Sequence, residues 1–304
     1  MDKFLDSNYS WITSNSSSPV FLYDSQSSLN TSGMKNCGVC DSVFHIHVFQ
    51  CLISSIGVAL NIINILILGS AELRRKPINF LLLALAMADF AFLLATIGRS
   101  LSYFLAYGYY FHILSHGISQ ILRSIGNVCE LTSIYLAVTV NTFRYIGVCF
   151  PFKEKPLCSM GRAKAAVIAI AISCTCTGLA LTFLQLVKWL DHTSKLAIVI
   201  WSYGILKSVP CFVMLILCPR MMYILSHQKA SFPRQYNKNN AHNMATLMLG
   251  IIVVLYPVCH LPANICFILG HTATIPFSYQ FALSFHTLIL VNSSITFFLY
   301  YFMY

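Results

Sequence analysis

Apolar residues form seven long runs along the chain, separated by short polar segments. About 20 apolar residues in a helix span a bilayer core about 30 Å thick. Each run reaches that length, so the pattern predicts membrane-spanning helices at residues 46–69, 78–101, 118–148, 163–186, 196–224, 243–270 and 277–304. We therefore expect an all-α membrane protein with a seven-helix bundle at residues 46–304, preceded by a polar tail at residues 1–45.

The composition supports a membrane protein and excludes a soluble one. Of the 304 residues, 57% are hydrophobic and 9% are charged, whereas a soluble domain carries about 25% charged residues. In water, such a chain would expose large apolar patches. The alternating strands of an outer-membrane barrel would lower the mean hydropathy below the +0.72 of this chain.

The N-terminal tail is rich in Ser and Asn and carries three glycosylation sequons, at Asn8, Asn15 and Asn30. Three sequons in one short segment predict an extracellular, glycosylated tail. The alternative is a Ser-rich tail that is never glycosylated. Cys37 and Cys40 also lie in this polar segment, and the sequence leaves open whether they pair with each other.

The net charge of +10 is distributed unevenly along the chain. Twelve of the 19 Lys and Arg residues lie at the ends of the first, third and fifth predicted helices or in the segments that follow these helices. Basic segments of this kind stay in the cytoplasm, so the N-terminus is expected outside the cell. The positive charge then faces anionic lipid and not nucleic acid. These residues are Arg74, Arg75, Lys76, Arg144, Lys153, Lys155, Arg162, Lys164, Arg220, Lys229, Arg234 and Lys238.

Short motifs within the predicted helices resemble those of the rhodopsin-like (class A) G-protein-coupled receptors. The third helix ends in Arg144-Tyr145 with Pro151 seven residues after the Arg. The other matching positions are Asn61, Asp89 in Leu-Ala-Met-Ala-Asp, Pro210, Pro262 in Cys-His-Leu-Pro, and Asn292-Ser293 followed by Tyr300. The overall pattern is similar to invertebrate, nematode-type peptide receptors of the FMRFamide kind.

The resemblance implies a plasma-membrane receptor that binds an extracellular ligand, expected to be a small peptide, and activates a heterotrimeric G-protein. It assigns G-protein coupling to Arg144, Tyr145, Pro151 and Tyr300. It also implies helix hinges, located at Pro210 and Pro262. No catalytic motif of the Gly-x-Ser-x-Gly, His-Glu-x-x-His or P-loop kind is present, so an enzyme is not expected.

The resemblance further assigns a sodium-binding site to Asp89. The residues that would complete this polar network are Asn61, Ser133, Asn292 and Ser293. A carboxylate with hydroxyl and amide oxygens suits a hard cation. The alternative is a protonated Asp89 that is hydrogen-bonded to Asn61 and Asn292 without an ion.

Charged residues within a bilayer are costly and indicate function. Glu130 lies about four helical turns above Arg144, near the floor of an outer pocket, and Lys207 is expected to face it. We expect a net-positive pocket suited to a ligand with an acid or amide group. The alternative is an ion pair that only stabilises the bundle. The pocket residues are Arg99, Arg123, Glu130, Lys207, His260 and His286.

The chain also departs from the family pattern. Phe143 stands where the family has an acid before Arg144, and Thr296-Phe297 replace Asn-Pro. No acid follows Asp191, so the sixth helix supplies none either. We therefore expect raised basal signalling, unless Arg144 extends to lipid phosphates instead. The competing interpretations are a transporter or channel and a decayed, non-signalling receptor homologue.

Overall fold

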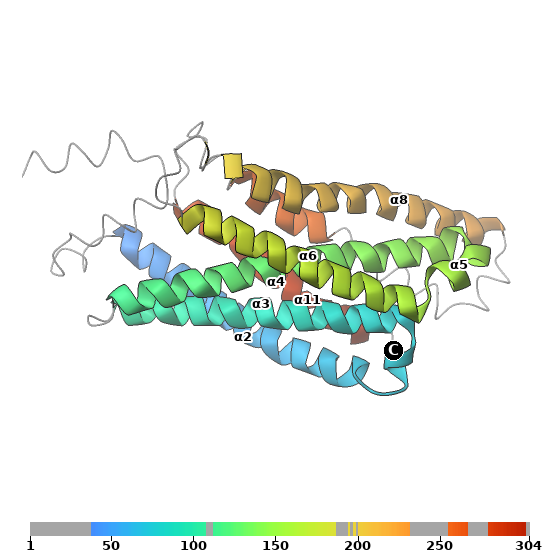
Figure 1. Cartoon of the computed structure of the whole chain (residues 1–304), viewed down its shortest axis with the longest axis horizontal. Coiled ribbons are helices and arrows are strands. Elements are labelled where there is room, and N and C mark those ends of the chain that lie inside the picture. The colour runs from blue at the N-terminus through green and yellow to red at the C-terminus, as the bar shows by residue number, and fades with distance from the viewer. Residues whose placement is uncertain are drawn as a thin grey trace, which may run out of the picture.

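The chain forms a bundle of long helices that run side by side (Figure 1). This computed structural model describes residues 38–107, 112–186, 200–231, 255–266 and 279–301, with the short pieces 194 and 197–198. No strand occurs in these ranges. The long helices are α2 (Gly38–Leu68), α3 (Pro77–Tyr107), α4 (His112–Cys149), α6 (Met160–Leu186), α8 (Ser208–Ser231) and α11 (Tyr279–Tyr301). The shorter ones are η3 (Leu73–Arg75), α5 (Pro151–Leu157), the π-helical η4 (Ile200–Lys207) and residues 255–266.

Each of the seven predicted spans contains a helix that the structure describes, with residues 255–266 as the described part of the sixth, and this confirms the predicted fold class. Within the described residues, five helices are long and apolar enough to cross a membrane, and Leu283–Ile295 forms a shorter apolar helix. The first helix begins at Gly38, eight residues before the predicted start. Helical hydrogen bonding does not require apolar side chains, so the helix continues past the apolar run into polar residues.

Helix α4 lies at the centre of the bundle and contacts α3, α5, α6, α8 and η4. On one side of it, α3 packs on α2, which in turn packs on α11. Large apolar side chains on the outer surface remain exposed, as with Leu66 (71%), Phe183 (68%) and Ile216 (68%). In a membrane these side chains face lipid, while buried polar side chains such as Asn61 and Gln50 of α2 bond to α11 inside the bundle.

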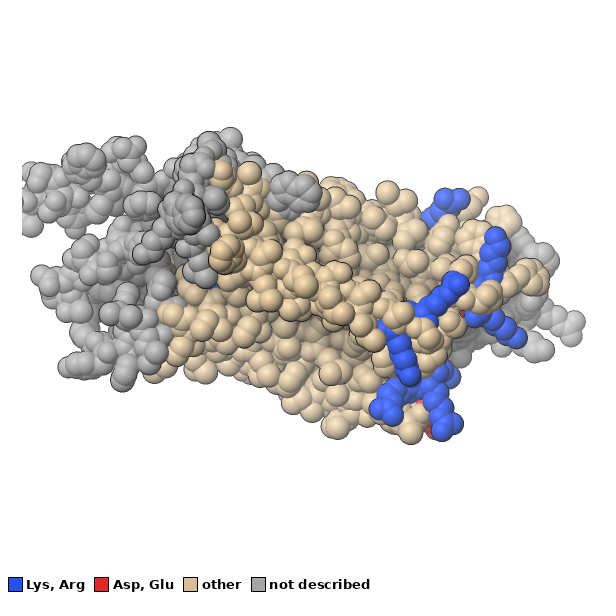
Figure 2. Space-filling view, viewed as in Figure 1, with Lys and Arg blue, Asp and Glu red and all other residues tan. Residues whose placement is uncertain are grey.

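The Lys and Arg side chains gather at one end of the molecule (Figure 2). This end contains η3, α5 and the start of α6, and the basic residues there are exposed. The described members of the predicted cytoplasmic segments thus share one end, as the charge pattern requires. They include Arg74, Arg75, Lys76, Lys153, Lys155, Arg162, Lys164 and Arg220.

Gly57 permits a close approach of α2 to α3 and α11. A Cβ atom at this position would collide with Ser294 Oγ and lie 2.8 Å from Leu93 Cδ1. We expect Gly57→Ala to lower the free energy of unfolding by about 1–3 kcal/mol, because the core is overpacked. Denaturant unfolding in detergent micelles measures this change. Gly161→Ala is the matched control, since nothing lies within 4 Å of its Cβ position, and a comparable loss there would contradict the explanation.

Candidate functional site

A buried ion pair joins α4 to the end of η4. Lys207 Nζ donates to Glu130 Oε2 at 2.7 Å, and the two side chains are 7% and 4% exposed. The second carboxylate oxygen, Oε1, lies 3.6 Å from Nδ1 of the buried His260. Three helical segments therefore meet at one carboxylate, at the position where the sequence predicts the pocket floor.

The backbone around Lys207 is itself unusual. Residues Ile200–Lys207 form a π-helix, and the chain continues directly as the α-helix α8. π-helical turns are rare and often occur at functional sites. The extra residue in each turn changes which side chains face the bundle, and Lys207, the last of this segment, is buried at 5% exposure.

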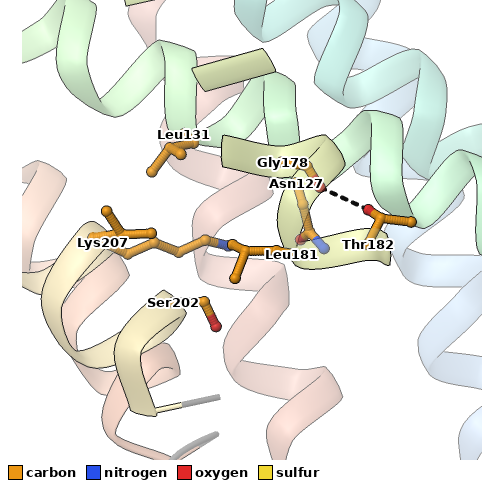
Figure 3. A pocket seen from close by; sticks show the side chains of 8 residues that line it. Asn127, Leu131, Gly178, Leu181, Thr182, Ser202 and Lys207 are labelled. Atoms are coloured by element: carbon orange, nitrogen blue, oxygen red, sulfur yellow. Dashed lines mark hydrogen bonds between the residues drawn. The ribbon is translucent and has the colours of Figure 1, made fainter. Parts of the chain in front are cut away.

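A cavity of about 40 Å³ adjoins Lys207 between α4, α6 and η4. This space is large enough for a few water molecules or the end of a ligand group. Three polar side chains besides Lys207 line it, from Asn127, Thr182 and Ser202 (Figure 3). The Thr182 hydroxyl donates to the Gly178 carbonyl at 2.8 Å, so it is fixed in place. These three residues were not predicted from the sequence. The position of Asn127, one helical turn from Glu130, was the signal that could have identified it.

A second polar connection between α4 and residues 255–266 lies one turn deeper. Tyr256 and His260 are stacked with ring centroids 4.5 Å apart and an interplanar angle of 3°. The Tyr256 hydroxyl lies 2.8 Å from Ser133 Oγ, and Ser133 donates to Asp89 Oδ1 at 2.6 Å. Tyr256 was not among the residues predicted from the sequence. The signal that could have identified it is its position four residues before His260, on the same helix face. A chain of contacts thus runs from Glu130 through His260, the stacked Tyr256 ring and Ser133 to Asp89.

The predicted polar network surrounds Asp89 in the bundle core. Asp89, Ser133, Asn292 and Ser293 are all buried. Asn61 Nδ2 donates to the Ser293 carbonyl at 3.0 Å and to the Gly57 carbonyl at 2.9 Å. Its Oδ1 is buried without a hydrogen-bond partner. These carboxylate, hydroxyl and amide oxygens fit a sodium ion by chemical type.

The remaining pocket residues lie toward the outer end of the bundle. Arg99 on α3, Arg123 on α4 and His286 on α11 are half-buried. His286 interacts electrostatically with Arg99, Glu130, Lys207 and His260. The six predicted pocket residues therefore come from five different segments of the bundle.

At the cytoplasmic end, Arg144 is buried at 8% exposure and Tyr145 is half-buried. Phe143, which replaces the family's acid, lies in an apolar cluster with Leu68, Leu81 and Val140. Two features escaped the sequence analysis. The ring of Phe152 on α5 is 98% exposed, and the carboxylate of Glu154 lies beside Gly147, one turn after Arg144.

The other predicted residues are placed less informatively. Pro210 is buried close to the point where η4 continues as α8, and Pro219 lies further along α8. Pro262 lies within the helical residues 255–266. Pro151 begins α5 and Tyr300 is near the end of α11. The sequons at Asn8, Asn15 and Asn30 lie outside the described residues.

Comparison with known proteins places the sequence among membrane receptors. The family model described as 7 transmembrane receptor (rhodopsin family) matches residues 60–301. The chain is similar to the FMRFamide receptor of Drosophila melanogaster, with 34% identity over 37% of this chain and 21% of the relative. It is also similar to the thyrotropin-releasing hormone receptor of Gallus gallus, with 30% identity over 38% of this chain and 29% of the relative.

A longer but weaker match reaches the growth hormone secretagogue receptor type 1 of Sus scrofa. The identity is 19% over 69% of this chain and 62% of the relative. The matched regions thus span between about a fifth and three fifths of the length of these curated relatives.

Proposed function

Because the chain belongs to the rhodopsin family of seven-transmembrane receptors, we propose that it binds a small extracellular peptide and activates a heterotrimeric G-protein. Members of this family are receptors, so the chain is a multi-pass protein of the plasma membrane and not an enzyme. The observation that carries the proposal is the buried Glu130–Lys207 pair with His260, where three segments of the bundle meet. Burying charges inside a membrane bundle is costly even when they are paired, so ionisable residues at this depth indicate a role in binding or switching.

Two features support a peptide as the ligand. Relatives of the chain are named as receptors for FMRFamide and thyrotropin-releasing hormone. The outer pocket also contains Arg99 and Arg123 above the paired Glu130 and Lys207. It therefore offers separate charged groups at different depths, which suit a ligand with several polar groups along its length. By resemblance to the family, Gly126 occupies the position at which receptors for amines carry an Asp. The absence of that Asp disfavours a simple monoamine as the ligand.

The polar contacts suggest how binding changes the receptor. Glu130 and Ser133 are three residues apart on α4, and they face His260 and Tyr256, which are four residues apart. A ligand group that engages Glu130 changes its contact with His260. A ligand that favours the changed arrangement shifts the population toward it. Pro262, within the helical residues 255–266, is the proposed hinge for this movement.

A sodium ion would be held by Asp89, Ser133, Asn292 and Ser293, and it would offset the charge of the buried carboxylate. Ser133 links this site to Tyr256 through its hydroxyl. A displacement of Tyr256 therefore removes one hydrogen bond from the group that orients Asp89. We propose that this connection couples the ligand pocket to the polar core.

At the opposite end of the bundle lie the proposed G-protein contacts, which are Arg144, Tyr145, Pro151 and Tyr300. We add the exposed Phe152 to this set of proposed contacts. A fully exposed aromatic ring next to basic residues is suited to docking on a partner with an apolar pocket and acidic rim. We expect Phe152→Ala to lower G-protein activation at least threefold without reducing surface expression. Phe183→Ala, which removes an exposed ring from the lipid-facing surface, is the matched control.

The experiment that tests the proposed function measures nucleotide exchange on G-proteins in membranes that contain the surface-expressed chain. Exchange is measured without ligand and with a library of short peptides. Activation that depends on Arg144 and Phe152 supports the proposal. Surface expression without activation under any condition would instead favour the decayed, non-signalling homologue.

A further inference from the structure

The outer end of the bundle contains a second polar cluster, away from the Glu130–Lys207 pair. It consists of His47 on α2, Arg99 on α3, Arg123 on α4 and His286 on α11, and we call it the basic corner. The outer ends of these three helices are Gly38, Tyr107 and His112, and the first three members lie about 12–17 Å from them along the helix axes. They are therefore at similar depth, although they are far apart in sequence.

Packing between the four helices brings these residues together. The His47 ring stacks on Tyr103 of α3, one turn from Arg99, with centroids 4.3 Å apart. A Cβ atom at Gly98 would lie 2.9 Å from Leu122 Cδ1, so the chain neighbours of Arg99 and Arg123 are in close contact. His286 lies beside Phe92 of α3, with ring centroids 5.9 Å apart. Two arginines and two histidines from four helices thus lie at this end of the bundle.

Several polar atoms in the basic corner are buried without a hydrogen-bond partner. They include Nδ1 of His47, Nε of Arg123 and Nδ1 of His286, and His47 is only 3% exposed. A buried polar group without a partner costs about 1–3 kcal/mol, and native proteins contain few of them. These three nitrogens come from three different helices, and each retains the capacity to donate or accept a hydrogen bond.

The acidic side chains that the structure places do not neutralise Arg123. Glu130 lies seven residues further along α4, about 10 Å deeper, and it is paired with Lys207 at 2.7 Å. Asp89 lies in the polar core, while Glu72 and Glu154 lie in the cytoplasmic segments. Among the described residues, Arg123 forms no ion pair. Counted over the side chains that the structure describes, the basic corner therefore has a net positive charge that a ligand can balance.

We propose that the basic corner is a subsite for a carboxylate, and that the peptide ligand of this receptor carries a free acid. Arginine binds carboxylates with two parallel hydrogen bonds, and such charge-assisted bonds are the stronger ones. A neutral C-terminal amide would leave the charge of Arg123 unbalanced. This inference rests on the proposed function and specifies the ligand class for the same pocket.

The main test compares two sets of tetrapeptides with the same sequences, all without Asp or Glu. One set ends in a free carboxylate and the other in an amide. We expect peptides of the acid set to activate the receptor at least tenfold more potently. Arg123→Gln should abolish this preference, Arg123→Lys should retain part of it, and the exposed cytoplasmic Arg162→Gln is the matched control. Equal potency of the two sets, or a preference that survives Arg123→Gln, would overturn the proposal.

A second measurement tests the subsite when neither peptide set activates the receptor. The melting temperature of the purified chain in neutral detergent is measured with N-acetylphenylalanine, with its amide, and with inorganic phosphate. Stabilisation by the carboxylate alone, lost in Arg123→Gln, keeps the subsite even if the peptide-receptor function fails. No stabilisation by the carboxylate removes the subsite. Equal stabilisation by phosphate indicates a phosphate or lipid-headgroup site and overturns the carboxylate assignment.

Discussion

Replacement of Lys207 by methionine is expected to lower the free energy of unfolding by about 3–5 kcal/mol. The ammonium lies 2.7 Å from Glu130 Oε2, and both side chains are almost completely buried. Methionine has similar length but no charge, so the Glu130 carboxylate would remain in the interior without its counter-ion. Denaturant unfolding in detergent micelles, monitored by the near-ultraviolet signal, measures the loss.

The double variant Glu130→Gln with Lys207→Met is the control for this prediction. It removes both charges, so no uncompensated carboxylate remains, and stability should return to within about 1 kcal/mol of the original chain. If the Lys207→Met variant has the same free energy of unfolding as the original chain, the result contradicts a buried ion pair at this position.

The same variants separate a binding role from a purely structural one. If Glu130 and Lys207 contact the ligand, the double variant is stable but responds to no peptide that activates the original chain. If the pair only stabilises the bundle, the double variant keeps its response. Lys207→Arg retains the charge and is expected to keep stability, so its peptide response reports on the geometry of the pocket alone.

The fold could be predicted from the sequence because the membrane imposes a simple rule. Apolar runs long enough to cross the bilayer must be helical, since lipid offers no hydrogen bonds to the backbone. The ends of helices were predicted less well, as Gly38 and His112 show. Beyond the bilayer the backbone continues as helix wherever neighbouring helices support it, and hydropathy does not report this.

The π-helical segment Ile200–Lys207 was not predictable for a related reason. Hydrophobic periodicity has no distinct signal for one extra residue in a turn, which depends on local packing against neighbouring helices. The sequence identified Lys207 as a partner of Glu130 because a charge in an apolar run is costly. It could not show that the backbone changes its hydrogen-bonding pattern at that residue.

Charge explains which site residues could be found. Glu130, Lys207, Arg99 and Arg123 were recognisable because ionisable groups are rare in membrane helices. Uncharged polar residues, such as Tyr256 and Asn127, cost less to bury than ions and gave no comparable signal until the structure placed them beside Ser133 and Lys207. His47 was missed because it lies at the very start of the first predicted span.

The Phe143 position illustrates how the two kinds of information combine. The sequence shows that the family's acid is absent, and the structure adds that Phe143 is 8% exposed in an apolar cluster. Cys158 also donates a weak hydrogen bond to the Phe143 carbonyl, at 3.7 Å. The substitution is therefore accommodated by packing, which supports a folded receptor whose resting state lacks the neighbouring carboxylate.

Introduction of that carboxylate by Phe143→Asp is expected to lower basal G-protein activation. An acid next to Arg144 would add a charge-assisted interaction to the resting state, of about 0.5–3 kcal/mol. Since about 1.4 kcal/mol changes an equilibrium tenfold, basal activity should fall between about twofold and more than tenfold. Nucleotide exchange without ligand, normalised to the amount of receptor at the cell surface, measures the change.

Phe143→Asn separates the effect of charge from the loss of packing. It removes the same aromatic ring and introduces a polar group of similar size to Asp, but it carries no charge. Both variants should lose stability, because both leave a space in the cluster with Leu81 and Val140. If Phe143→Asn lowers basal activation as much as Phe143→Asp, the carboxylate is not the restraint.

In that case Glu154 becomes the residue to neutralise, because its carboxylate already lies beside Gly147. Glu154→Gln should then raise basal activation.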